Sequence, residues 1–251
     1  MSPFRRIAVT AVAAVCFPVV LVLSAVPAVS SQKATLTKNE IRQAERWLAD
    51  LGFWTGPIDG VWDGASRHAL TAFQKLQKAK PTGRLTRAEW NALSVAAPFK
   101  PRHKQGPHVE VDIARQVLFL VDSEGKVGNI LPISSGSGKR FYENGYPETH
   151  AITPCGRLEV YQKMSGWKKS PLGEMHNPLY IVGGIAIHGS LDVPPYPASH
   201  GCIRIPMFAS VSLPKMVPKG TPVYVYGCKD EKKTPVASGG EADGEEIVAR
   251  Q

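Results

Sequence analysis

A short segment around residue 200 combines one cysteine with two histidines, the residue types of a thiol nucleophile and its base. His200 lies two residues before Cys202, and His188 lies fourteen residues before it. A cysteine attacks as the thiolate, and a nearby neutral imidazole can take the thiol proton. Gly201 has no side chain, so a substrate carbonyl can approach the backbone there, where the N–H groups of Gly201 and Cys202 would hold an oxyanion. The segment predicts acyl transfer by Cys202.

The surrounding residues indicate how these groups are positioned. His188 follows the apolar run 185–187, typical of a buried strand, so we expect a rigid imidazole. Prolines at 194, 195 and 197 stiffen the loop between His188 and Cys202. Zinc ligation by His188, His200 and Cys202 is an alternative, but no Asp or Glu follows where a base would be needed. A buried, inert Cys202 is a second alternative. We expect no metal and no cofactor.

Composition and the N-terminus predict the compartment. The chain has 251 residues, 43% hydrophobic and 20% charged, which is a globular balance for one or two domains. Arg5 and Arg6 precede an uncharged run, and Ala28-Val29-Ser30 fits a cleavage site, so residues 1–30 predict a secretory signal peptide. Left uncleaved, a run of about 23 residues would span a bilayer and tether the protein. Outside the cytoplasm, the net charge of +9 suits a cell-wall polyanion rather than nucleic acid.

Removing residues 1–30 leaves three cysteines, an odd number for an exported protein. The simplest arithmetic pairs Cys155 with Cys228 and leaves Cys202 as the reactive thiol. Three free thiols are the alternative.

Residues 31–95 are predicted to form a small all-α three-helix bundle that could just fold alone. Capping boxes at 37–40 and 86–89 open the first and third helices. Apolar residues recur at helical spacing in 41–51 and 69–76. Residues 96–107 form a basic, Pro-rich linker, which we expect to be an extended spacer.

From residue 108 the apolar pattern alternates with a period of two, so residues 108–228 predict a mainly β, sandwich-like domain of short strands. The one good helix candidate lies near residues 207–216. Residues 229–251 carry mixed charge with Gly and Ser and predict a disordered tail.

The helical segment resembles the peptidoglycan-binding module found beside many cell-wall enzymes. The resemblance covers about 36–95 and rests on Leu51-Gly52-Phe53, Ile58-Asp59-Gly60 and the run 69–74, Ala-Leu-Thr-Ala-Phe-Gln. Trp54 and Trp62 lie in predicted loops, where sugar stacking and core packing are both open. The resemblance implies that peptidoglycan is a partner.

The cysteine segment resembles the signature of the L,D-transpeptidase (YkuD-type) catalytic domain. That signature is a His followed later by Ser/Thr-His-Gly-Cys-hydrophobic-Asn/Arg, matched here by His188-Gly189 and by 199–204, Ser-His-Gly-Cys-Ile-Arg. The resemblance extends over about 108–228, including the turn 153–156, Thr-Pro-Cys-Gly. Two departures matter: the gap before Ser199 holds only ten residues, so a lid over the site would be reduced, and Arg204 replaces Asn.

The resemblance implies an exported enzyme that acts on peptidoglycan stem tetrapeptides, releases D-Ala and forms 3→3 cross-links through a Cys202 acyl-enzyme. His188 would be the base, oriented by the Gly189 carbonyl, and His200 would aid the oxyanion donors at Gly201 and Cys202. Ser199 and Arg204 would bind substrate, Arg204 through a carboxylate. An L,D-carboxypeptidase of the same fold, in which water is the acceptor, and a zinc-dependent peptidoglycan hydrolase are the alternatives. The implied location is the cell envelope.

Overall fold

The computed structural model describes residues 35–142 and 148–228. The predicted signal peptide and the predicted tail lie outside these residues. Within the described ranges, no helix is both long enough and apolar enough to cross a membrane.

Three helices lie in the N-terminal segment, as the sequence predicts. The Thr37 and Thr86 side chains both make the predicted capping boxes, with Glu40 and Glu89 respectively. The Asp63 carboxylate caps the second helix by accepting from the Ser66 N–H. The helices are α1 (Lys38–Asp50), α2 (Gly64–Leu76) and α3 (Arg87–Ser94).

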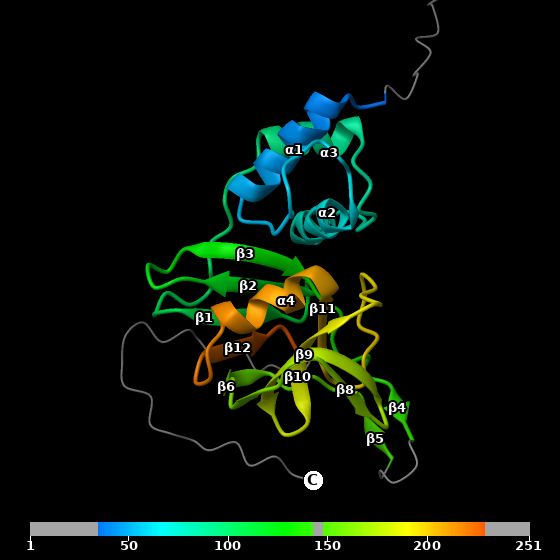
Figure 1. The fold of residues 1–251 in the computed structure, drawn as a ribbon, viewed down its shortest axis with the longest axis vertical. Helices are drawn as coiled ribbons and strands as arrows, with labels where there is room; N and C mark the ends of the chain where they lie inside the picture. Colours follow the sequence, from blue (N-terminus) through cyan, green and yellow to red (C-terminus); the bar gives the residue numbers. More distant parts are fainter. Residues whose placement is uncertain (1–34, 143–147, 229–251) are drawn as a thin grey trace, which may run out of the picture. The chain divides into compact units, whose positions relative to one another are not determined.

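The rest of the described chain is mainly β with one short helix, which confirms the predicted character of this domain (Figure 1). One sheet has the strand order β3-β2-β1-β12-β6, and a second has the order β11-β10-β9-β7 with β8 paired to β9. The first sheet comprises β1 (His108–Asp112), β2 (Val117–Val121), β3 (Val127–Pro132), β6 (Gly156–Glu159) and β12 (Pro222–Tyr226). The second comprises β7 (Gln162–Lys163), β8 (Trp167–Ser170), β9 (Gly173–Val182), β10 (Ile185–Ser190) and β11 (Ile203–Pro206). The helix is α4 (Met207–Met216), and β4 (Arg140–Phe141) pairs with β5 (Thr149–His150).

One hydrophobic core joins the two sheets and α4. Alternate residues of β1, β2, β9, β11 and β12 point into it, as the period of a strand requires. The fully buried members include Val111 on β1, Leu118 on β2, Ile187 on β10 and Ile203 on β11. This core fixes β10, which carries His188 and Gly189, and β11, which begins directly after Cys202.

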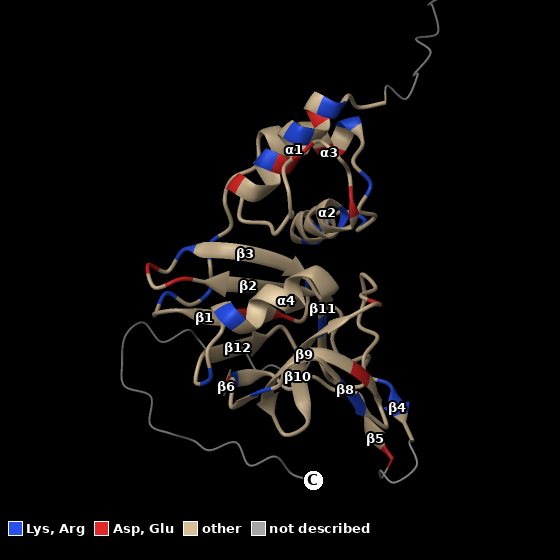
Figure 2. Cartoon of the chain, in the orientation of Figure 1, with Lys and Arg blue, Asp and Glu red and all other residues tan. Residues whose placement is uncertain are grey.

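A second core is shared between the helices and the first sheet. Phe73 of α2 packs in it together with Phe119 of β2 and Ile130 of β3. The backbone joins the two parts as well, because the Ile130 N–H donates to Gly52 O at 2.7 Å and Ile130 O accepts from the Trp54 N–H at 3.2 Å. Strands β2 and β3 carry no charged side chain (Figure 2), which is why both of their faces can be covered. The prediction of a self-contained three-helix bundle is not confirmed, since the helices bury their apolar faces partly against the sheet.

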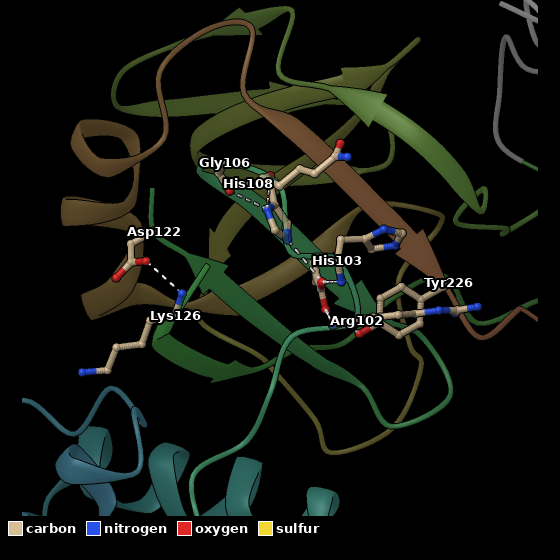
Figure 3. A network of polar contacts seen from close by, with 9 residues as sticks. Arg102, His103, Gly106, His108, Asp122, Lys126 and Tyr226 are labelled. Carbon is tan, nitrogen blue, oxygen red and sulfur yellow. Dashed lines mark hydrogen bonds and ion pairs between the residues drawn. The ribbon is translucent and has the colours of Figure 1, made fainter. Parts of the chain in front are cut away.

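The segment 96–107 is fastened to the first sheet rather than held as a free spacer (Figure 3). The backbone N–H groups of Arg102 and His103 donate to the buried carboxylate of Glu110 at 2.9 and 2.6 Å. The Tyr226 hydroxyl donates to the same carboxylate, and His108 Nε2 lies 3.2 Å from it. Burial alone would raise the pKa of Glu110, but these contacts hold it below the usual value.

Two tryptophans of the N-terminal segment pack against neighbouring residues and do not point freely into solvent. Trp62 packs against the second core, and its Nε1 donates to Gly83 O at 3.1 Å. Trp54 packs against the first core and meets Phe208 edge-on at 6.2 Å between ring centroids. Both contacts favour the core-packing interpretation over sugar stacking.

Candidate active site

Strands β10 and β11 run parallel and bring the predicted residues to one face of their sheet. Ile187 pairs with Ile203, and both side chains point into the core. Because side chains alternate along a strand, His188 and Arg204 project from the opposite face, and Cys202 shares that face just before β11. A pocket of about 580 Å³ lies there and is lined by His188, Ser199, His200, Cys202 and Arg204.

The Cys202 thiol is half-buried and lies against the β9–β10 turn. Its Sγ accepts from the Ala186 N–H at 3.5 Å and donates to Gly184 O at 3.8 Å. Burial raises the pKa of this thiol above its usual value, although the Ala186 N–H and the charge of Arg204 oppose that shift. At rest Cys202 is therefore a thiol, and it would need a base to act as a nucleophile.

His188 has the protonation state of such a base. Its Nδ1 lies 2.9 Å from Gly189 O, and because a carbonyl only accepts, the proton sits on Nδ1 and Nε2 carries the lone pair. The side chain is buried, which lowers the pKa of His188 to about 4; the Gly189 contact opposes the shift, and Arg204 adds to it. The imidazole is neutral at physiological pH.

The packing around residue 189 leaves room only for glycine. A Cβ at this position would lie 2.3 Å from Ser210 Oγ and 2.5 Å from Ser210 Cβ, on α4. Any side chain would push β10 away from α4 and would move the carbonyl that holds His188.

The loop 199–202 is fixed by hydrogen bonds that the sequence did not reveal. The Ser199 hydroxyl donates to Cys202 O at 2.6 Å and accepts from the Gly201 N–H at 3.0 Å. Gly201 has a φ of +140°, and its carbonyl accepts from the Thr153 hydroxyl at 2.6 Å. The Gly201 N–H, which was expected from the sequence to hold the oxyanion, is therefore already hydrogen-bonded within the loop. The Ser199 hydroxyl bonds the backbone of the same loop and does not point to substrate.

A trans peptide unit places its C=O and N–H on opposite sides. With Gly201 O directed at Thr153, the Cys202 N–H points the other way. Thr153 is buried, and its Oγ1 also accepts from the Gly136 N–H at 2.9 Å, so this orientation is held at both ends.

His200 and Arg204 occupy the edges of the pocket. The exposed His200 ring meets Phe141 edge-on at 4.7 Å. Arg204 Nη1 lies 3.5 Å from the carboxylate of the largely exposed Asp192. So loose an ion pair contributes little and leaves the guanidinium able to bind a ligand.

The hairpin β8–β9 also lines the pocket, although the sequence pattern did not mark this segment as a hairpin. Trp167 on β8 and Glu174, Met175 and Tyr180 on β9 contribute side chains. The sequence feature that could have predicted this hairpin is the turn 170–173, Ser-Pro-Leu-Gly, in which Gly173 has a φ of +124°.

The described cysteines pair as the arithmetic predicted. Cys155 and Cys228 form a disulfide, and Cys202 is free. Within residues 35–142 and 148–228, no three His, Cys, Asp or Glu side chains come together in a group that could hold a metal ion, the set His188, His200 and Cys202 included.

Comparisons with known proteins agree with this arrangement. The YkuD family model, described as the L,D-transpeptidase catalytic domain, matches residues 106–225, and the PG_binding_1 model, a peptidoglycan binding domain, matches residues 37–93. A solved L,D-transpeptidase from Xylanimonas cellulosilytica is 36% identical with a TM-score of 0.70, and the match covers 74% of this chain and 93% of that one. An L,D-transpeptidase from Stackebrandtia nassauensis is 20% identical with a TM-score of 0.44, covering 76% of this chain and 92% of that one.

Among curated proteins, the localization factor PodJL of Caulobacter vibrioides is 44% identical over 54 residues. The match spans 22% of this chain and only 6% of that protein. The Xylanimonas structure, by contrast, is covered almost completely at substantial identity. The chain therefore belongs to the L,D-transpeptidase family and is an L,D-transpeptidase with a peptidoglycan-binding domain.

Proposed function

We propose that this transpeptidase forms 3→3 cross-links between peptidoglycan stems through an acyl-enzyme on Cys202. The observation that carries the proposal is the shared pocket face of β10 and β11, where a free thiol lies with an imidazole whose Nε2 lone pair is unprotonated.

In the acylation step, the thiol proton passes to His188 Nε2 and Sγ attacks the carbonyl carbon between the third stem residue and the terminal D-Ala. The amide bond breaks, and the D-Ala nitrogen leaves with the proton returned by His188. A thioester on Cys202 remains. An acceptor amine then attacks the thioester, gives its proton to His188, and Cys202 leaves as the thiol.

The oxyanion donor that fits this geometry is the Cys202 N–H, because the Gly201 N–H is bonded to Ser199. Ser199 holds the loop, in place of the substrate-binding role expected from the sequence. Arg204 binds a stem carboxylate, and the exposed His200 contacts substrate at the mouth of the pocket.

The two peptidoglycan-associated domains support action at the cell envelope. Export by residues 1–30, with or without a retained membrane tether, and the boundaries 31–95, 96–107 and 108–228 remain part of this proposal.

Mass spectrometry of the purified protein with a disaccharide-tetrapeptide tests the reaction. Wild type should yield a dimer that lacks one D-Ala, and Cys202→Ala and His188→Ala should yield none. A Cys202-dependent tripeptide without dimer would instead indicate the carboxypeptidase. Activity in Cys202→Ala above a tenth of wild type, or activity lost with EDTA and restored by zinc, would overturn the thiol mechanism.

A further inference from the structure

Lys75 of helix α2 is a buried lysine that no step of the proposed reaction uses. It lies on the side of the helix that faces the first sheet, and only 8% of it is exposed. Its Nζ donates to Gln116 O and to Ile133 O, each at 3.0 Å. A side chain of the peptidoglycan-binding domain thus holds two backbone carbonyls of the catalytic domain.

Ile133 directly precedes the loop 134–138, and Gln116 lies beside Ile133, whose N–H donates to Gln116 O at 3.0 Å. Gln116 has a φ of +56°, a conformation that non-glycine residues adopt only where contacts hold them. Its side chain clamps Ser135: Nε2 donates to Ser135 Oγ at 2.7 Å, and Oε1 accepts from the Ser135 N–H at 2.9 Å. Gln116 and Ser135 are both buried.

Ser135 in turn fixes the loop that carries the nucleophile. Its carbonyl accepts from the N–H groups of Ala198 and Ser199 at 3.0 and 2.9 Å. The Ser199 hydroxyl then bonds Gly201 N–H and Cys202 O. An unbroken chain of bonds runs from Lys75 through Gln116, Ser135 and Ser199 to Cys202.

We propose that Lys75 is a positioning residue for Cys202, so that the peptidoglycan-binding domain supplies part of the framework of the active site. The proposal rests on the proposed role of Cys202 as nucleophile. The lysine amine is suited to the task, because even its neutral form carries two N–H donors and can hold two carbonyls at once. Replacing it by an apolar side chain takes a donor from each carbonyl in a buried place, and the loop 134–138 loses one of its supports.

The test uses the full-length protein with Lys75→Met, which keeps an unbranched, packed side chain without donors. Gln116→Met removes both side-chain bonds to Ser135 and serves if Lys75→Met folds poorly. Lys80→Met is the matched control, since Lys80 is exposed and lies just beyond α2. The readouts are kcat and KM with a soluble disaccharide-tetrapeptide, the alkylation rate of Cys202 by iodoacetamide, and sacculus binding.

We expect kcat to fall about tenfold in Lys75→Met, with KM changed less than about twofold, because misplacement acts on the chemical step rather than on ground-state binding. Gln116→Met should behave alike, and Lys80→Met should match wild type. Combined with Ser199→Ala, Lys75→Met should cost much less than the product of the two single losses, since both variants break one chain.

A folded Lys75→Met protein with wild-type kcat, or strictly multiplicative losses with Ser199→Ala, would overturn the positioning role. If Lys75→Met does not fold, wild-type kcat in a folded Gln116→Met protein overturns it instead. Failure of the thiol mechanism is seen separately, as dimer formation that persists in Cys202→Ala or after complete alkylation of Cys202.

Discussion

The Thr153 hydroxyl donates a 2.6 Å hydrogen bond to the carbonyl of Gly201, the residue immediately before the proposed nucleophile. This bond sets the plane of the peptide whose N–H belongs to Cys202. It comes from a turn 48 residues earlier in the chain.

Thr153→Val should therefore reduce kcat by about ten- to a hundredfold, somewhat less than the loss of an oxyanion donor itself, because the peptide is freed rather than removed. Thr153→Ser keeps the hydroxyl and should retain most activity. Steady-state kinetics on the soluble substrate decide it; a valine variant as active as the serine variant would show that the bond does not orient the donor.

The thiol of Cys202 should alkylate slowly at neutral pH and faster as the pH rises. Burial raises the pKa of Cys202, and His188, with a pKa of about 4, does not hold a proton that would stabilise a thiolate. We expect the rate with iodoacetamide to rise about tenfold per pH unit from 6 to 8, following the thiolate fraction. A rate independent of pH over that range would indicate a resting thiolate–imidazolium pair.

Gly189→Ala should abolish most activity and lower the melting temperature, because its Cβ would overlap Ser210 on α4. Gly64→Ala is the matched control: a Cβ there meets nothing within 4 Å. Activity and melting temperature are measured for both variants. Equal values for the two would mean that β10 and α4 can move apart at little cost in free energy.

Deleting residues 36–95 should destabilise the catalytic domain and not merely weaken wall binding. The deletion would expose the faces of β2 and β3 that carry Phe119 and Ile130, and uncovered apolar faces of this kind aggregate. Differential scanning fluorimetry and size-exclusion chromatography of the truncated chain report this. A monomeric truncation with an unchanged melting temperature would contradict it.

The contribution of Lys75 to stability should grow with pH. Burial lowers the pKa of Lys75 to about 7 in the folded protein, against 10.5 when exposed. Between these values the unfolded chain binds the proton and the folded one does not, so the free energy of unfolding rises with pH, by up to about 1.4 kcal/mol per unit. Nearby His68, whose pKa burial lowers, stays neutral throughout this window.

Denaturant unfolding of wild type and Lys75→Met at pH 7.5 and 9.5 measures the effect as a change in their difference. Lys75→Met has no such proton, so the difference should shift in favour of wild type at the higher pH. A difference that stays constant would show that Lys75 keeps its proton when buried.

The sequence predicts what is local in the chain. The three helices follow from apolar spacing and capping boxes, and the group His188, His200 and Cys202 follows from one short motif. The hydrogen bonds that fix the motif join segments far apart, from Lys75 to Gln116 and from Thr153 to Gly201, and no pattern within either segment announces them. Lys75 is the clearest case: a lysine at the edge of an amphipathic helix is ordinarily solvated, and only the sheet against it makes it buried.

The alternation at the start of the catalytic domain shows the same limit. The polar residues that alternate with Val109, Val111 and Ile113 predict a strand with one solvent-exposed face. The structure buries Glu110 instead, because the segment 96–107 covers that face and supplies donors to the carboxylate. The alternation predicts the strand. Which segment covers its second face depends on the path of the rest of the chain.

The shared core and the fastened segment 96–107 fix how far the enzyme can reach. A flexible tether would let the catalytic pocket sample a volume around its anchor, with a local concentration of substrate set by tether length. In this protein the distance from the peptidoglycan-binding domain to Cys202 is set by the fold and not by the length of a tether. When that domain binds peptidoglycan, the substrate that the catalytic pocket can reach lies at a set distance from the bound domain.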